Sequence, residues 1–272
     1  MHANGRMDRR HWLKLSASAL LAAGLWPGCA RWGNNGRGGS FRFVALNDTH
    51  FHTAQCRAWF ERVGASILAQ QPKPEFCLVI GDLAQNGTPA ELGPMRDLLR
   101  SLAMDFHVVP GNHDSISDTD RSAWEQLFPN SLNYGFEHRG WQFIGLDSTQ
   151  GLGWQKTRIQ PATLSWLDQH LRKLRPAAPT VLFTHFPLGP AVTYRPINAD
   201  ELLDRFREFN LAAVLNGHFH GFTERVLRST VLTTNRCCAI SRDNHDGSKE
   251  KGYFVCTAAN GQVAREFVQV AA

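Results

Sequence analysis

Residues 41–50 read Phe-Arg-Phe-Val-Ala-Leu-Asn-Asp-Thr-His, an apolar run that ends in a carboxylate and an imidazole. Four later apolar runs are also followed by Asp, Asn or His. The five runs are 41–46, 76–80, 106–109, 180–183 and 211–215. Short apolar runs of this kind are typical of buried strands, and ligands of open α/β sheets bind beyond the carboxyl ends of the strands. The sequence therefore predicts strands that deliver polar side chains to one rim.

Seven side chains that follow these runs are candidate metal ligands: Asp48, His50, Asp82, Asn112, His185, His218 and His220. One four-coordinate ion needs four donors, whereas seven donors with a shared carboxylate suit two ions. Oxygen and nitrogen donors without a thiolate suit iron, manganese or zinc. We therefore expect two divalent or trivalent metal ions as cofactors.

The donors lie in five short blocks, which follow one another in this order: Asp48-Thr49-His50, residues 81–87, residues 111–114, Thr184-His185 and residues 217–220. With these blocks the chain resembles the calcineurin-like metallophosphoesterase superfamily. The resemblance implies an α/β fold, a four-layer α/β/β/α sandwich of two mixed β-sheets flanked by helices. It also implies a single domain over residues 41–272, with the metals at one edge of the sandwich.

The resemblance further implies how the seven residues divide between the ions. Asp48, His50, Asp82 and His220 would hold the first ion. Asp82, Asn112, His185 and His218 would hold the second, so Asp82 would bridge. Two cations about 3.5–4 Å apart activate a bridging hydroxide and neutralise the phosphoryl oxygens. The expected activity is hydrolysis of a phosphodiester.

Two residues of the third block are candidates for catalysis without metal ligation. His113 could protonate the leaving oxygen, a role that histidine often fills; the alternatives are an additional ligand or a solvated loop residue. Asp114 is expected to fix a neighbouring imidazole or the turn itself.

Substrate selectivity is expected from the loops beside the site, because the ligands contact only the phosphate. Asn112 is a candidate substrate contact, as are Trp154 in the loop 148–160 and Tyr194 and Arg195 in the loop 187–197. Arg158 is a further candidate cation, and His245 is expected to be a surface residue.

Differences from the family pattern narrow the activity. Gln85 stands where a purple acid phosphatase has tyrosine, and the arginine of calcineurin-type phosphatases is missing after Asn86-Gly87. The blocks look most similar to class III cyclic-nucleotide phosphodiesterases and glycerophosphodiesterases. Alternatives are a 5′-nucleotidase, a nucleotide pyrophosphatase or a phosphomonoesterase. A non-catalytic metal-binding protein is a third hypothesis, but it would predict gaps among the seven donors.

The first 30 residues resemble a twin-arginine export signal. Arg9-Arg10 precedes an apolar stretch, 15–25, that is too short to span a bilayer. Cleavage after Ala30 is expected, with lipidation of Cys29 as the alternative, and residues 31–40 predict a flexible spacer. The expected partners are the twin-arginine export machinery and a small phosphoester, and the expected location is extracytoplasmic. Membrane association is expected only if Cys29 is lipidated.

The net charge of +5 does not predict nucleic-acid binding. Residues 1–30 carry four basic residues and one acidic residue, so the rest of the chain carries only +2. The periodicity predicts helices over 55–70, 88–102, 161–174 and 198–209, and Asn260-Gly261 predicts a hairpin. Thr88 and Glu91 predict a capping box. A disulfide between Cys237 and Cys256 is one alternative to free thiols.

Overall fold

The computed structural model describes residues 39–271. The predicted export signal, Cys29 and most of the predicted spacer therefore lie outside the described residues. Within residues 39–271, no helix combines the length and the hydrophobicity that crossing a membrane requires.

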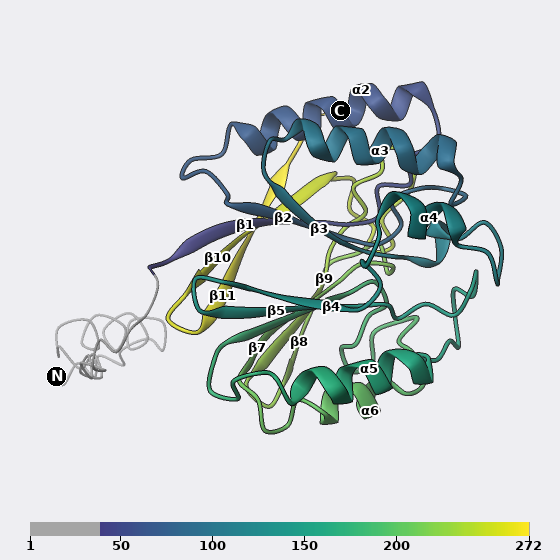
Figure 1. Ribbon diagram of the computed structural model, residues 1–272. Coiled ribbons are helices and arrows are strands. Elements are labelled where there is room, and N and C mark those ends of the chain that lie inside the picture. The colour runs from purple at the N-terminus through teal and green to yellow at the C-terminus, as the bar shows by residue number, and fades with distance from the viewer. Residues whose placement is uncertain (1–38, 272) are drawn as a thin grey trace, which may run out of the picture. The chain divides into compact units, whose positions relative to one another are not determined.

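The first sheet has five strands in the order β11-β10-β1-β2-β3 (Figure 1). Their bounds are β1 Phe41–Leu46, β2 Phe76–Ile80, β3 Asp105–Val109, β10 Gly252–Ala259 and β11 Gln262–Gln269. Strands β1, β2 and β3 are parallel, whereas β10 and β11 add an antiparallel pair on the other side of β1. The carboxyl ends of β1, β2 and β3 therefore lie at the same edge.

The second sheet has six strands in the order β4-β5-β6-β7-β9-β8. Their bounds are β4 Tyr134–His138, β5 Trp141–Leu146, β6 Thr180–Thr184, β7 Leu211–Asn216, β8 Thr223–Leu227 and β9 Thr230–Thr234. The four central strands are parallel, and an antiparallel strand closes each edge. Both sheets are thus mixed.

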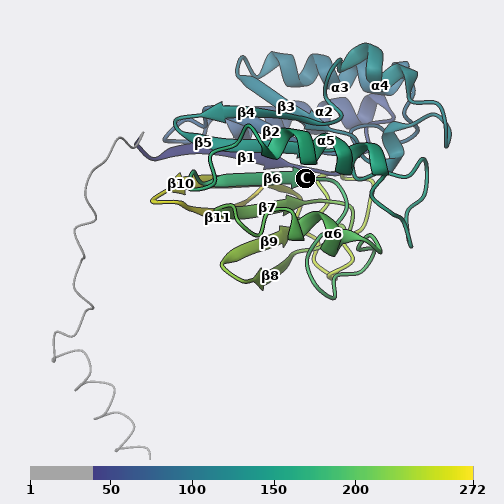
Figure 2. The same ribbon diagram turned by 60° about the horizontal axis from the view of Figure 1, so that its bottom comes forward.

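Helices cover the outer face of each sheet (Figures 1 and 2). Helices α2 (Ala54–Leu68) and α3 (Pro89–Ser101) lie over the first sheet, together with the short α4 (Ser122–Leu127). Helices α5 (Pro161–Leu171) and α6 (Ala199–Asp204) lie over the second. The predicted four-layer α/β/β/α sandwich is confirmed.

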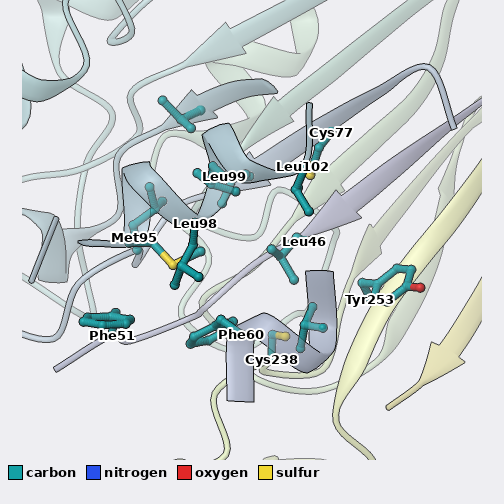
Figure 3. Packing of buried hydrophobic residues seen from close by; sticks show 14 of the residues in the cluster. Leu46, Phe51, Phe60, Cys77, Met95, Leu98, Leu99, Leu102, Cys238 and Tyr253 are labelled. Carbon is teal, nitrogen blue, oxygen red and sulfur yellow. The ribbon is translucent and has the colours of Figure 1, made fainter. Parts of the chain in front are cut away.

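Alternation along each strand divides the core into three layers. On β1, Phe43 and Ala45 face the second sheet, while Val44 and Leu46 face α2 and α3. Figure 3 shows part of this outer layer, where Phe60 of α2 and Met95 of α3 pack near Leu46. The burial of both faces explains why the strands appear in the sequence as continuous apolar runs.

The helices predicted over 55–70, 88–102 and 161–174 and the predicted hairpin are confirmed, with small shifts in the helix ends. The expected hairpin has Asn260 at φ 53° and Gly261 at φ 76°, the left-handed pair that a two-residue turn requires. The predicted capping box is wrong: Thr88 makes no side-chain cap, and Glu91 instead accepts hydrogen bonds from the main-chain and side-chain nitrogens of Asn86. The helix predicted over 198–209 ends earlier, at Asp204.

The disulfide alternative for Cys237 and Cys256 is wrong, because both thiols are free. Cys256 lies on β10 in the layer between the sheets, whereas Cys237 lies in the loop after β9.

His107 on β3 provides a pH-dependent contribution to stability. Its ring stacks on Phe136 at 3.6 Å between centroids, and burial lowers its pKa to about 4, assisted by His138 and opposed by Asp105. A lowered histidine pKa means that protonation favours the unfolded chain, so stability is lost as the pH falls from about 6.5 towards 4.

We therefore expect the parent to lose about 1 kcal/mol more unfolding free energy than His107→Phe between pH 7 and pH 5, a value reduced for solvent screening of the partly exposed ring. Urea unfolding at the two pH values measures this difference. Equal losses in the two proteins would contradict the assignment.

Candidate metal centre

The seven candidate ligands lie on loops that main-chain hydrogen bonds hold together beyond the strand ends. Asp48 N donates to Gly81 O at 3.1 Å, and His50 N donates to Asp82 O at 2.9 Å. Across the two sheets, the His218 main-chain nitrogen donates to the Asp48 carboxylate at 3.1 Å. The predicted rim is therefore formed by both sheets together.

Five candidate ligands have positive φ angles, a conformation that is uncommon for residues other than glycine. They are Asp48, His50, Asp82, His218 and His220, with φ between 41° and 63°. Strained backbone of this kind persists only where the surrounding structure enforces it, and it often occurs at functional sites. The residue types alone did not predict this feature.

The first donor set consists of four buried residues whose ligand atoms all lie within 4.8 Å of one another: Asp48, His50, Asp82 and His220. The Nε2 atoms of His50 and His220 are 3.1 Å apart. His220 Nε2 lies 3.3 Å from Asp48 Oδ1, and His50 Nε2 lies 3.6 Å from Asp82 Oδ2. This set matches the residues predicted for the first ion.

The second donor set contains Asp82, His185 and His218, also within 4.8 Å of one another. His185 Nε2 is 3.3 Å from Asp82 Oδ2 and 3.2 Å from His218 Nδ1. Asn112 lies in the turn beside Asp82, since the next residue, His113, donates its main-chain N–H to Asp82 Oδ1 at 2.9 Å. Asp82 thus belongs to both sets.

Hydrogen bonds fix which imidazole nitrogens face the second set. His185 Nδ1 donates to Ile80 O at 3.0 Å, and His218 Nε2 donates to Trp154 O at 2.7 Å, since a carbonyl oxygen can only accept. In the neutral rings, His185 Nε2 and His218 Nδ1 therefore carry lone pairs. Two lone pairs at 3.2 Å repel each other unless a cation or a proton lies between them.

The donors fit metal ions by distance and by hydrogen bonding. Two nitrogens bound to one ion at about 2.1 Å on nearly perpendicular bonds lie about 3.0 Å apart, close to the 3.1 and 3.2 Å separations of the two histidine pairs. The Asn112 side-chain oxygen is buried and makes no hydrogen bond within the described chain. An ion would satisfy it.

The pKa values of His185 and His220 indicate that the cluster attracts positive charge, whereas burial lowers the pKa values of His50 and His218 to about 3 and about 4. Burial opposes protonation of His185, but Asp82 and Asp48 together raise its pKa to about 9. Burial likewise opposes protonation of His220, yet Asp48 raises its pKa to about 11. The same pairs hold the pKa of both carboxyl groups well below the usual range, although burial alone would raise it. Cations bound here would replace those protons.

Two glycines allow the loops to approach closely. Gly81 has φ 77°, and a Cβ added there would collide with the His185 ring. A Cβ at Gly111 would collide with the Asp82 carboxylate. Side chains at these positions would displace the donors, which gives the two glycines a physical role beyond ordinary turns.

His113 and Asp114 have different surroundings. His113 is half-buried, with its ring 4.8 Å from that of His50. Its Nδ1 donates to Gln85 O at 2.8 Å, which leaves Nε2 free. Asp114 is fully buried and accepts from the main-chain nitrogens of Ala84 and Gly111 at 2.8 and 2.9 Å. Asp114 therefore joins two ligand-bearing turns.

The aromatic candidates in the outer loops contact each other. Tyr194 lies 5.6 Å from Trp154 and 5.4 Å from His218 between ring centroids. Trp154 is 51% exposed, so its ring is open to solvent beside the second donor set.

The arginine candidates are held elsewhere. The Arg195 guanidinium binds Leu188 O and the Asp200 carboxylate, and Arg158 pairs with Glu201. The contacts of Arg195 brace the loop that carries Tyr194, and its role as a substrate contact stays a prediction.

Sequence reasoning missed three residues near the centre. His245 is exposed as expected, but its main-chain N–H donates to His220 O at 2.8 Å and its ring lies 5.4 Å from the His220 ring. Arg242 donates to the Gln85 side chain at 2.6 Å. Cys237 lies beside His50 and His220. None follows an apolar strand run, which was the signal that identified the other residues.

Comparison with known proteins gives the same family as the sequence motifs. The family model of calcineurin-like phosphoesterases matches residues 41–222, which hold both donor sets. The chain belongs to the calcineurin-like phosphoesterase family. Among curated proteins, a probable glycerophosphodiester phosphodiesterase of Arcobacter nitrofigilis is 32% identical to this chain over 174 residues, which cover 60% of this chain and 63% of the relative.

Two other relatives differ in their named activities. A 3′,5′-cyclic-nucleotide phosphodiesterase of Nostoc is 32% identical over 161 residues, covering 55% of this chain and 57% of the relative. A bovine serine/threonine-protein phosphatase is 31% identical over 211 residues, covering 68% and 66%. The chain thus spans less than two thirds of the length of the first relatives it matches.

Among solved structures, a purple acid phosphatase from yellow lupin superposes with a TM-score of 0.62 at 12% identity, covering 86% of this chain and 52% of that one. At this identity the likeness concerns the fold alone.

Proposed function

We propose that this protein is a binuclear-metal phosphodiesterase. The observation that carries the proposal is Asp82, a fully buried carboxylate shared by two sets of buried donors. Its Oδ2 lies 3.6 Å from His50 Nε2 and 3.3 Å from His185 Nε2, so one carboxylate oxygen faces both donor sets, while Oδ1 accepts from the His113 main-chain nitrogen. The donor types, with Asn112 in the second set, suit iron, manganese or zinc.

The metals, when bound, supply neutralisation of charge on the phosphoryl oxygens and a water with a lowered pKa. The residues of the chain fix the donors in place. Carbonyl oxygens hold the rings of His185 and His218, and Asp114 ties together the turns that carry Asp82 and Asn112. Such outer contacts orient ligands and preserve their affinity.

His113 is proposed as the acid that protonates the leaving oxygen. Its hydrogen bond to Gln85 O fixes the ring and leaves Nε2 to carry the proton that is transferred. A histidine acts well in this role because its ordinary pKa is near neutrality.

A diester is favoured as substrate because relatives named for glycerophosphodiester and cyclic-nucleotide hydrolysis align with this chain. The alternative is a phosphomonoesterase, which the aligned bovine phosphatase favours. Nucleotide substrates remain a further alternative, for which the exposed Trp154 provides a ring that can stack on a base.

Export is a separate part of the proposal. Arg9-Arg10 and the apolar residues 15–25 support passage through the twin-arginine machinery, with cleavage after Ala30 or lipidation of Cys29. The mass of the N-terminal peptide of protein recovered from the extracytoplasmic fraction tests this, and an intact Met1 would contradict it.

A substrate panel tests the activity. Metal-reconstituted protein is assayed with glycerophosphodiesters, 3′,5′-cyclic nucleotides, bis-aryl and mono-aryl phosphates and 5′-nucleotides. The proposal expects the largest kcat/KM on a diester. A preference for monoesters would favour a phosphomonoesterase. No turnover while two ions are bound would favour a non-catalytic metal-binding protein.

The aromatic pair at the rim should govern substrate selectivity. We expect Tyr194→Ala and Trp154→Ala to change KM by about 2- to 13-fold among the esters, depending on the organic group, since stacking contributes about 0.5–1.5 kcal/mol. The kcat for a simple aryl diester should change little. Arg158→Ala is the matched control, because Arg158 lies in the same loop as Trp154 but pairs with Glu201. Unchanged KM values in both variants would place selectivity elsewhere.

A further inference from the structure

We propose that the Cys237 thiol is an additional ligand of the first donor set, recruited when that set holds a soft divalent ion such as Cd²⁺ or Zn²⁺. The inference rests on the metal centre proposed above. It adds a sulfur donor to a site for which the sequence predicted only oxygen and nitrogen.

The distances carry the proposal. Cys237 Sγ, a nitrogen of His50 and a nitrogen of His220 all lie within 4.8 Å of one another. A sulfur and a nitrogen bound to one ion at about 2.3 and 2.1 Å are at most about 4.4 Å apart. A small movement of the side chains would therefore bring all three atoms onto one ion. All three residues are buried.

Hydrogen bonds hold Cys237 against the loop that follows β1. Cys237 N donates to Asn244 Oδ1 at 3.1 Å, and Sγ donates to Asp48 O at 3.2 Å. The two residues that follow Cys237 donate their main-chain nitrogens to Asn47 O and Asp48 O at 3.2 and 3.0 Å. The thiol is thus fixed beside the main chain of a predicted ligand, with no exposed surface.

A second observation concerns His50. Its Nδ1 is buried and has no hydrogen-bond partner among the described residues. Main-chain carbonyls fix the orientation of the His185 and His218 rings, but no such bond fixes the His50 ring. The His50 ring thus lacks the carbonyl hydrogen bond that holds the other two rings, while its Nε2 faces His220 Nε2 at 3.1 Å.

Whether Cys237 binds should depend on which metal ion occupies the first site. Thiolate sulfur is a soft donor that binds zinc and cadmium well, whereas manganese prefers oxygen. When the sulfur–metal bond forms, the S–H bond breaks and its proton passes to water. The thiol should therefore raise the preference of the first site for Cd²⁺ or Zn²⁺ over Mn²⁺.

The test is a titration of the metal-free full-length protein with Cd²⁺, followed by near-ultraviolet absorption from sulfur-to-cadmium charge transfer. The matched control is Cys238→Ser, because Cys238 is adjacent, equally buried and packed in the hydrophobic layer under α2. We expect the band in the parent and in Cys238→Ser and its loss in Cys237→Ser. Any contribution of the other thiols cancels in this comparison. The affinity for Cd²⁺ relative to Mn²⁺ should fall about 10–100-fold in Cys237→Ser.

The ¹¹³Cd chemical shift of the parent protein gives a reading that needs no variant, because a sulfur ligand moves it strongly downfield. A downfield resonance for one of two bound ions supports the inference. Two bound ions without a sulfur-shifted resonance overturn the role of Cys237 and leave the metal centre intact. Failure to bind Cd²⁺ at all overturns both.

Discussion

Asp82→Asn is expected to lower kcat by about 10³-fold or more and to leave fewer than two ions bound per chain. The amide keeps the size of the side chain but removes its charge and one of its two acceptor oxygens. Metal-derived stabilisation of the transition state is worth several kcal/mol, and each 1.36 kcal/mol is a factor of ten in rate. Because Asp82 belongs to both donor sets, both ions should bind more weakly.

Elemental analysis after dialysis, together with the rate on an aryl diester, measures this effect. Asp97→Asn is the control, since Asp97 is an exposed carboxylate that pairs with Arg96 and with no other cation in residues 39–271. A variant of Asp82 that retains two ions and the parental rate would rule out the bridging role.

His113→Ala should reduce kcat by about 10²–10⁴-fold, the range of positioned acid–base groups, while both ions remain bound. The loss should be smaller for nitrophenyl esters than for alkyl esters, because a good leaving group needs less protonation. His52→Ala is the matched control: its Nδ1 contacts His50 O at 2.9 Å, yet the residue belongs to neither donor set.

The alternatives for His113 give different results. Loss of an ion in His113→Ala would identify the residue as a ligand. Equal losses for every leaving group would mean that the ring positions Gln85 through its hydrogen bond to Gln85 O and transfers no proton, because the main-chain N–H that holds Asp82 Oδ1 is still present in His113→Ala.

The strands and the two donor sets could be predicted because both depend on local patterns. The run Phe41–Leu46 is apolar except for Arg42, and the donors Asp48 and His50 follow within four residues of its end. Parallel strands then bring their carboxyl ends to one edge. The half-buried strand β4 was missed because its sequence, Tyr134–His138, shows no apolar run.

Contacts that depend on tertiary packing could not be predicted. Arg195 was expected at the substrate, but the fold places Asp200 within reach and pairs the two. Cys237 follows β9, whose sequence Thr-Val-Leu-Thr-Thr is not an apolar run, and it shows no zinc spacing, yet its thiol donates to Asp48 O. Asp48, with its positive φ angle, likewise takes its partners from distant parts of the chain: its main-chain nitrogen donates to Gly81 O, and its carboxylate accepts from the His218 main-chain nitrogen.

Anomalous X-ray diffraction from crystals soaked in Mn²⁺ or Zn²⁺ tests the shared-carboxylate centre most directly. We expect two peaks about 3.5–4 Å apart, with Asp82 between them. His50 and His220 should contact one peak, and His185 and His218 the other. A single peak, or two peaks of which only one contacts Asp82, would contradict the binuclear account.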